Sequence, residues 1–261
     1  MSSFSALTSL SGVTEGILCP PFAWCAIQGG PVILENAIHY GGTQGGSFVV
    51  SDFWLARYPI TNAQFDRFLA HAQGYADLRW WQYSSAAHQW RSDHPHAQPT
   101  AFEGDNLPRT RVSWFDCQAF CAWLSAQLTA AGSPAQVYLP TEQEWQRAAL
   151  GDTGWQYPWG DELDETRANY GHLVGSPSAV DSYPQGQSVY SVYDLVGNVW
   201  EWCQTAWGGE DREQPDDYAH RAIRGGAWNV SNPEYLRPAD RGGHPPRGRL
   251  NDCGFRIACT L

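Results

Sequence analysis

Cysteine and histidine side chains are the first groups in this sequence whose type and spacing could support metal or redox chemistry. Cys117 and Cys121 lie four residues apart, so a helix would place both thiols on one face, as in half of a metal site. No second closely spaced pair of cysteines or histidines follows nearby. We therefore expect these cysteines to be buried and reduced, because a free cysteine behaves as a small hydrophobic residue.

The closest histidine pair is His94 and His96, which a proline separates in a stretch rich in tryptophan and histidine. The proline favours a solvated loop, so we expect no metal at this pair. The seven cysteines are an odd number in a long chain, and a complete disulfide framework is not expected.

The charged residues exclude several classes of function. All 16 basic residues are arginines, and the net charge is −11. The absence of lysine excludes a Schiff-base lysine, a phosphate-binding lysine of the Walker type and a lysine general base. An acidic chain without a basic stripe is a poor nucleic-acid binder, so no nucleic-acid partner is expected. Arginine suits bidentate pairing with carboxylates or stacking on tryptophan.

The length and hydrophobic content predict a folded domain with a substantial core. The chain has 261 residues, of which 43% are hydrophobic and 14% aromatic. No stretch approaches the roughly 20 apolar residues that a membrane span requires. The first residues lack the basic and apolar regions of a signal peptide. We therefore expect no membrane partner and a cytoplasmic location.

Three helices can be expected from their capping signals. Thr61 with Gln64, and Thr141 with Glu144, form the pattern of a capping box. Ser113 opens a further helix, which carries an apolar inner face.

The remaining chain reads as short strands and loops around these two or three helices. Strand patterns occupy residues 22–33, 47–58 and 137–139. Residues 74–108 read as a long surface loop that its own aromatic residues fold over the core. We expect a flexible N-terminus over residues 1–16 and a single domain over residues 17–261. This arrangement predicts an α+β fold that is rich in loops, with short antiparallel strands.

Seven ordered motifs give the sequence a resemblance to a known family. The motifs are residues 53–62 (FWLARYPITN), 112–114 (VSW), 139–145 (LPTEQEW), 157–161 (YPWGD), 194–202 (DLVGNVWEW), 224–228 (RGGAW) and 254–258 (GFRIA). In this order they resemble the formylglycine-generating-enzyme or sulfatase-modifying-factor domain, a variant of the C-type lectin fold. The resemblance implies that fold, but a fold hosts many functions.

The resemblance implies oxidation of a substrate cysteine only where two active-site cysteines follow the RGGAW turn. Members of the family that oxidise a substrate cysteine bind copper(I) through this thiol pair, since soft thiolates suit that ion. The matching positions of this sequence hold Val230 and Tyr235, and neither residue can supply a thiolate. Formylglycine-generating chemistry and a copper cofactor are therefore not expected. The nearby Cys253 and Cys259 do not match the motif.

Iron and calcium are the other two metals that the resemblance raises. Iron-dependent relatives carry a His-x3-His-x-Glu run, which this sequence lacks, so no iron is expected. Family members often bind calcium in the DLVGNVWEW loop. The resemblance would assign Asp194 and Glu201 as carboxylate ligands, with Gly197 and Val199 as backbone ligands. The alternative is that both carboxylates pair with arginines or cap loop amides, and the sequence leaves this open.

The C-terminal segment of residues 229–252 is irregular, polar and rich in arginine, and it lies between two fixed motifs. In another branch of this fold, the variable proteins of diversity-generating retroelements, this segment is the diversified ligand-binding surface. The resemblance predicts contacts from Asn229, Ser231, Asn232, Tyr235, Arg237, Asp240, Arg241, Gly242, His244, Arg247, Arg249, Leu250 and Asn251. Tyrosine and arginine are among the residues that dominate binding energy at interfaces.

We therefore expect a non-catalytic binding protein with a protein or peptide ligand. The sugar-binding Glu-Pro-Asn motif of true lectins is not present. One alternative is an oxidase or sulfatase-modifying factor that uses a metal or other cysteines. Cys203, Cys253 or Cys259 meeting in one exposed cleft would favour this alternative. A second alternative is an accessory subunit that docks one fixed partner.

Overall fold

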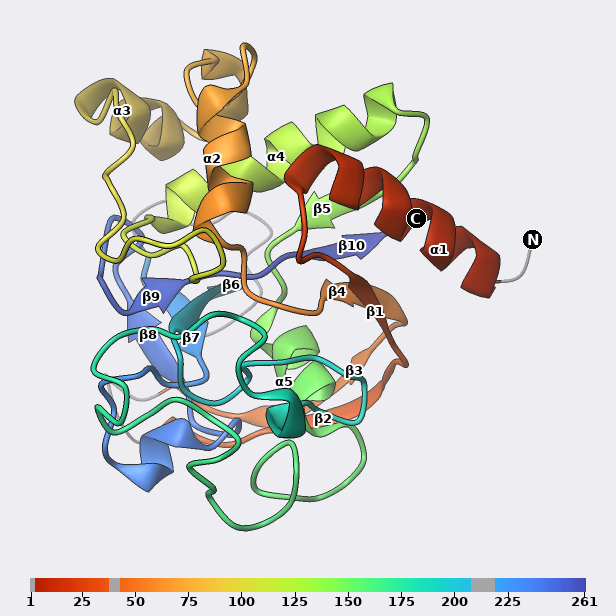
Figure 1. The fold of residues 1–261 in the computed structure, drawn as a ribbon, viewed down its shortest axis with the longest axis vertical. Coiled ribbons are helices and arrows are strands. Elements are labelled where there is room, and N and C mark those ends of the chain that lie inside the picture. Colours follow the sequence, from red (N-terminus) through yellow and green to blue (C-terminus); the bar gives the residue numbers. More distant parts are fainter. Residues whose placement is uncertain (1–2, 38–42, 208–218) are drawn as a thin grey trace.

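The computed structural model describes residues 3–37, 43–207 and 219–261. Figure 1 shows α2, α3 and α4 at the upper end of the molecule and the loops of residues 150–195 at the lower end. The α-helices of the described residues are α1 (Ser3–Leu18), α2 (Asn62–Ala70), α3 (Ser85–Asp93), α4 (Trp114–Ala130) and α5 (Glu142–Leu150). Three short 3-10 helices are η1 (Leu78–Trp81), η2 (Pro184–Gly186) and η3 (Pro233–Leu236).

Ten short strands form three small sheets in the described residues. The strands are β1 (Trp24–Ile27), β2 (Gly30–Leu34), β3 (Gly46–Val50), β4 (Phe53–Ala56), β5 (Gln136–Tyr138), β6 (Trp200–Ala206), β7 (Arg221–Arg224), β8 (Gly242–His244), β9 (Cys253–Gly254) and β10 (Ala258–Thr260). The sheet orders are β1-β4-β10-β5, β2-β3 and β8-β7-β6-β9. The pairings are antiparallel except between β6 and β9, which run parallel. The predicted α+β fold is confirmed.

The caps predicted from the sequence fix the starts of three helices. Thr61 opens α2, Ser113 opens α4 and Thr141 opens α5, each with a complete capping box. Each cap satisfies backbone N–H groups that the first turn of a helix leaves without partners.

The structure has more helices than the two or three that we expected, and the first is at the N-terminus. Within the segment of residues 1–16 that we expected to be flexible, α1 begins at Ser3, and it packs Leu10, Thr14 and Leu18 into the core. The hydroxyl of Thr14 accepts a hydrogen bond of 3.0 Å from the indole of Trp24. Glycine and serine are weak helix formers, so their number in this segment hid the four-residue spacing of its buried side chains.

The second departure lies in the segment of residues 74–108, which we expected to be irregular. It contains η1 and α3, and the hydroxyl of Ser84 caps α3 by accepting a bond from the amide of Ala87. Three buried tryptophans, Trp80, Trp81 and Trp90, hold the segment on the core. Tertiary packing of these rings outweighs the low helix propensity of the segment.

The largest core cluster gathers aromatic side chains from α2, α4, β6 and the link between β9 and β10. Phe65 and Phe120 stack with ring centroids 5.7 Å apart, and Phe255 packs edge-on against both rings. This core is the rigid frame beneath the C-terminal segment. Among the described residues, no helix has the length and apolar character to cross a bilayer.

Candidate ligand-binding face

A buried ion-pair centre holds the C-terminal segment on the frame. Glu142, in the first turn of α5, is 1% exposed. Arg241 donates to its two oxygens at 2.7 and 2.8 Å, and Arg224 donates at 2.9 Å. Arg224 also donates to the backbone carbonyl of Pro238. These bonds fix the backbone of the segment near its centre.

The thirteen predicted contact residues divide by exposure. The exposed residues are Ser231, Asn232, Arg247 and Asn251. The half-buried residues are Asn229, Tyr235, Arg237, His244, Arg249 and Leu250. The buried residues are Asp240, Arg241 and Gly242. We define the outward face as the ten exposed and half-buried residues.

The three buried residues do not belong to the outward face, and this corrects the set that we predicted. Arg241 is 3% exposed because both sides of its guanidinium fork serve Glu142 and nearby backbone carbonyls. Gly242 lies in β8, where it pairs with Ile223. Asp240 is 9% exposed. A polar pattern in a loop does not distinguish an outward side chain from one that holds the loop in place.

Arg249 joins the outward face to the tryptophan-rich segment. Its guanidinium donates to both carboxylate oxygens of Asp116 at 3.1 Å and to the hydroxyl of Tyr75 at 3.3 Å. The same guanidinium lies 4.8 Å from the ring centroid of Trp90. The segment of residues 74–108 therefore borders the face as well as covering the core.

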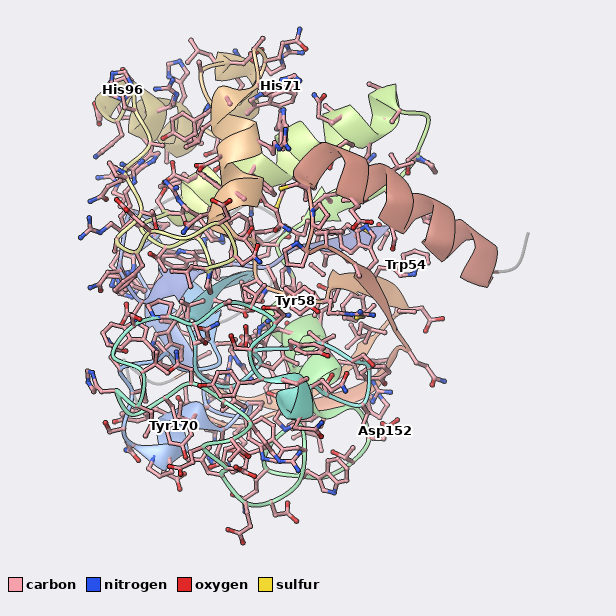
Figure 2. The ribbon with its side chains drawn as sticks, viewed as in Figure 1. Trp54, Tyr58, His71, His96, Asp152 and Tyr170 are labelled. Carbon is pink, nitrogen blue, oxygen red and sulfur yellow. The ribbon has the colours of Figure 1, made fainter. Side chains whose placement is uncertain are left out.

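A second border comes from the loop of residues 171–175, which sequence reasoning missed. The amide of Gly171 donates to the carbonyl of Val230, and that of His172 donates to the carbonyl of Trp228, both at 2.8 Å. The rings of His172 and Phe102 pack edge-on against Trp228, with centroids 5.3 and 5.8 Å away. The next residues, Leu173 and Val174, are 54% and 52% exposed. In the sequence, the only local sign of this border was the apolar pair Leu173 and Val174 in a short segment between two glycines. Figure 2 shows the adjoining Tyr170 at the end of the molecule opposite His71.

The positions that match the family's thiol pair lie within this region. Val230 packs against Leu236 and neighbouring apolar side chains. Tyr235 lies in η3, and its amide donates to the carbonyl of Asn232 at 3.1 Å. Val230 therefore serves packing, and the backbone of Tyr235 helps to form η3.

All seven cysteines are free thiols, and they lie elsewhere. Six are buried, namely Cys25, Cys117, Cys121, Cys203, Cys253 and Cys259, while Cys19 is half-buried. Burial raises the pKa of each of the six buried thiols, so they stay protonated at neutral pH. Cys203, Cys253 and Cys259 are each 0% exposed, so they do not meet in an exposed cleft.

The histidine pair gives no metal cluster in the described ranges. The ring of His94 stacks on Trp90 at 3.7 Å and contacts its carbonyl at the end of α3. Figure 2 shows His96 beyond α3, at the helical end of the molecule. Within residues 3–37, 43–207 and 219–261, no three histidine, cysteine, aspartate or glutamate side chains are grouped for a metal ion.

Glu201 of the DLVGNVWEW loop pairs with an arginine, whereas Asp194 accepts a hydrogen bond from a neutral side-chain amide. Glu201 is 0% exposed and accepts two bonds of 2.6 Å from Arg256, as well as one of 2.7 Å from the indole of Trp145. A cation beside Glu201 would therefore face the guanidinium of Arg256. Asp194 accepts a bond of 3.0 Å from the side-chain amide of Asn198. Burial raises the pKa of Asp194 to about 7. Calcium binding through Asp194, Gly197, Val199 and Glu201 stays a prediction.

Comparison with known proteins defines the family. Residues 23–261 match the sulfatase-modifying factor enzyme 1-like domain of the FGE-sulfatase family. The chain is 32% identical over 244 residues to hercynine oxygenase of Mycobacterium tuberculosis, and the match covers 81% of this chain and 53% of that protein. It is 30% identical over 255 residues to inactive C-alpha-formylglycine-generating enzyme 2 of Mus musculus, covering 81% of this chain and 76% of that protein. The chain spans about half the length of the hercynine oxygenases that it matches.

Solved structures share the fold at lower identity. Variable protein 1 of Treponema denticola matches with a TM-score of 0.66 and 22% identity, over 91% of this chain and 95% of that one. PvdO from Pseudomonas aeruginosa matches with a TM-score of 0.65 and 20% identity, over 93% and 95%. This chain belongs to the FGE-sulfatase family and shares its fold with the Treponema denticola variable protein 1.

Proposed function

We propose that this chain is a non-catalytic binding protein whose outward face takes a protein or peptide ligand. One observation carries the proposal: Val230 and Tyr235, neither of which can supply a thiolate, occupy the positions that match the family's thiol pair. An oxidase of the formylglycine-generating type needs reactive thiolates at an open site. The six buried thiols of this chain are protonated and covered.

The construction of the outward face supports recognition. Its backbone is tied to the core through Glu142 and through Arg249, so little order has to be gained on binding. Aromatic and apolar side chains border it, including Trp90, Phe102 and Leu173. Loops on a rigid frame are where proteins usually place recognition.

Two of the similar proteins are consistent with a role without catalysis. The mouse relative is named as inactive, and the Treponema structure is named as a variable protein. Diversification of this chain is a narrower proposal. It predicts a reverse-transcriptase gene and a near-copy of the 3′ end of this gene in the same genomic neighbourhood. Absence of both would leave a fixed binding face or an accessory subunit with one constant partner.

Selection from a phage-displayed peptide library tests the proposed face directly. Peptides enriched on the wild-type protein should lose about tenfold or more in affinity on the Ser231→Tyr/Asn251→Tyr double variant, since both exposed positions then obstruct the face. The control is Thr129→Tyr, an exposed position near the end of α4 that should leave affinity unchanged. Equal binding to the wild type and to the double variant would contradict the proposed face.

An enzyme is the second candidate, and the identity to hercynine oxygenase is the observation that favours it. A formylglycine-generating oxidase or modifying factor would need thiols or a metal from elsewhere in the chain. A copper(I) titration with a parallel count of free thiols distinguishes the two candidates. A binding protein keeps all its thiols free, whereas an oxidase of this type loses free thiol as copper binds.

A further inference from the structure

Arg111 lies at the edge of the outward face, although it is far from residues 229–252 in the sequence. Its backbone amide donates to the carbonyl of Leu250 at 2.8 Å. A second bond of 3.0 Å joins the amide of Trp114 to the carbonyl of Pro246. Residues 111–114 therefore run beside the last part of the C-terminal segment.

The guanidinium of Arg111 is available to a ligand. The side chain is half-buried, and none of its nitrogens is buried without a partner, so the charged group reaches solvent. It makes no side-chain hydrogen bond, ion pair or ring contact with another described residue. Most other arginines of the described ranges pair with a carboxylate, as Arg224, Arg249 and Arg256 do. The contrast indicates that the partner of Arg111 lies outside the chain.

The backbone of Arg111 is consistent with a role in binding. Its φ is 56°, in the left-handed region that glycine adopts at the least cost. A long side chain persists there only where the surrounding structure holds it, and the bond to Leu250 does so. Residues held in this way cluster at functional sites.

The charge of the outward face is positive overall. Its ten residues include three arginines and neither aspartate nor glutamate, in a chain of net charge −11. At one end of the face, Arg237 is neutralised by Glu35 and Glu234. The other end, where Arg111 joins the exposed Arg247, is the more positive of the two.

The carboxylates around this positive end already have partners. Asp116 is 2% exposed and accepts bonds from Arg249 and from the hydroxyl of Ser113. Asp252 accepts a bond of 3.0 Å from the side-chain amide of Asn229. Neither forms an ion pair with Arg111. The positive charge of Arg111 is therefore left for a carboxylate of the ligand.

We propose that Arg111 binds a carboxylate of the ligand, so that the outward face takes a peptide segment that contains aspartate or glutamate. A planar guanidinium binds a carboxylate through two parallel hydrogen bonds, which gives direction as well as charge. Charge complementarity of this kind adds specificity and speeds encounter. The inference rests on the proposed function, because it names the chemistry of the ligand that the same face takes.

Fluorescence anisotropy with peptides selected on the wild-type protein tests the inference. Each aspartate or glutamate of a selected peptide is replaced in turn by asparagine or glutamine. At least one replacement should weaken binding about tenfold or more. Arg111→Gln should weaken binding of the parent peptide by a similar factor. It should bind the weakened peptide as the wild type does, because both changes remove the same ion pair.

Arg67→Gln is the matched control. Arg67 also lacks a side-chain partner among the described residues, and it lies on α2, outside the outward face. This variant has the same change of net charge and should leave affinity unchanged. The peptide replacements leave the protein unaltered, so they test the ligand's charge even if Arg111→Gln lowers stability.

The outcomes separate this inference from the proposed function. Selected peptides without acidic residues would overturn it, and so would an Arg111→Gln variant that binds the parent peptide as tightly as the wild type does. Either result leaves the outward face as a binding face. Failure to select any peptide overturns both proposals.

Discussion

Glu142 receives hydrogen bonds from Arg224 and Arg241, and Glu201 receives them from Arg256 and Trp145. All of these charged groups are buried at 3% exposure or less. A planar guanidinium can serve a carboxylate and backbone carbonyls at once, which the compact ammonium of lysine cannot do with the same geometry.

Removal of the charge at Glu142 should strongly destabilise the fold. In Glu142→Gln, two buried arginines lose their carboxylate partner, and a loss of about 3–5 kcal/mol in the free energy of unfolding is expected. Urea denaturation measures it. The control is Glu234→Gln, whose exposed carboxylate pairs with Arg237 and should change stability little. A loss no larger than that of the control would contradict the role of Glu142.

Asp194 should make stability depend on pH. Burial raises its pKa to about 7, while an unfolded aspartate titrates near about 3.9. Between these values the folded chain holds a proton that the unfolded chain releases. The contribution of Asp194 is therefore fully present below about pH 4 and is lost as pH rises to about 7.

Asp194→Asn should remove this dependence. In a chelating buffer, we expect its melting temperature to exceed that of the wild type by about 3 °C or more at pH 8, with a gap that closes toward pH 4. A gap that does not vary with pH would be the contrary result. Added calcium that stabilises the wild type but not Asp194→Asn at pH 8 would support the calcium prediction.

Which carboxylate pairs with which arginine was the feature least predictable from the sequence. The composition indicated that arginines pair with carboxylates, and they do. The partner of Arg241 is 99 positions away, however, and only the folded chain brings the two together. A local polar pattern therefore placed Arg241 on the surface, where the structure has it buried.

At the scale of elements, the sequence predicted correctly the helix starts whose signals lie within a few neighbouring residues. The caps at Thr61, Ser113 and Thr141 act within three residues, and all three helices begin as expected. α1 and α3 are stabilised mainly by packing on the core, so their sequences gave weak signals. The loop of residues 171–175 was missed for the same reason, because its place is set by bonds to Val230 and Trp228.

Arg249 should control how firmly the tryptophan-rich segment is held beside the outward face. Arg249→Gln loses the ion pair with Asp116 and the contact with Trp90. Hydrogen exchange by mass spectrometry should then be about tenfold faster in the segment around Tyr75 and Trp90, and unchanged in α5. An equal rise in the exchange rate in this segment and in α5 would contradict the prediction, because it would show that Arg249 acts on global stability alone.

For the whole molecule, seven motifs predicted the family and the fold, because most of them serve the frame. Function depends instead on positions between the motifs, where Val230 and Tyr235 stand. The structure adds that six of the seven thiols are buried and that Cys19 is half-buried.

The reactivity of the thiols provides a global check. At pH 8, only the half-buried Cys19 of the native protein should react quickly with a thiol reagent, while all seven cysteines react after denaturation. Rapid reaction of two or more thiols in the native protein would show an accessible pair that the structure does not have.

The most direct measurement is incubation of the protein with copper, reductant, oxygen and a cysteine-bearing peptide, followed by mass spectrometry. A formylglycine-generating enzyme serves as the positive control. A binding protein should leave the peptide unchanged and retain no copper after gel filtration. Conversion of the cysteine to an aldehyde, or copper that co-elutes with the protein at the expense of free thiol, would contradict the account.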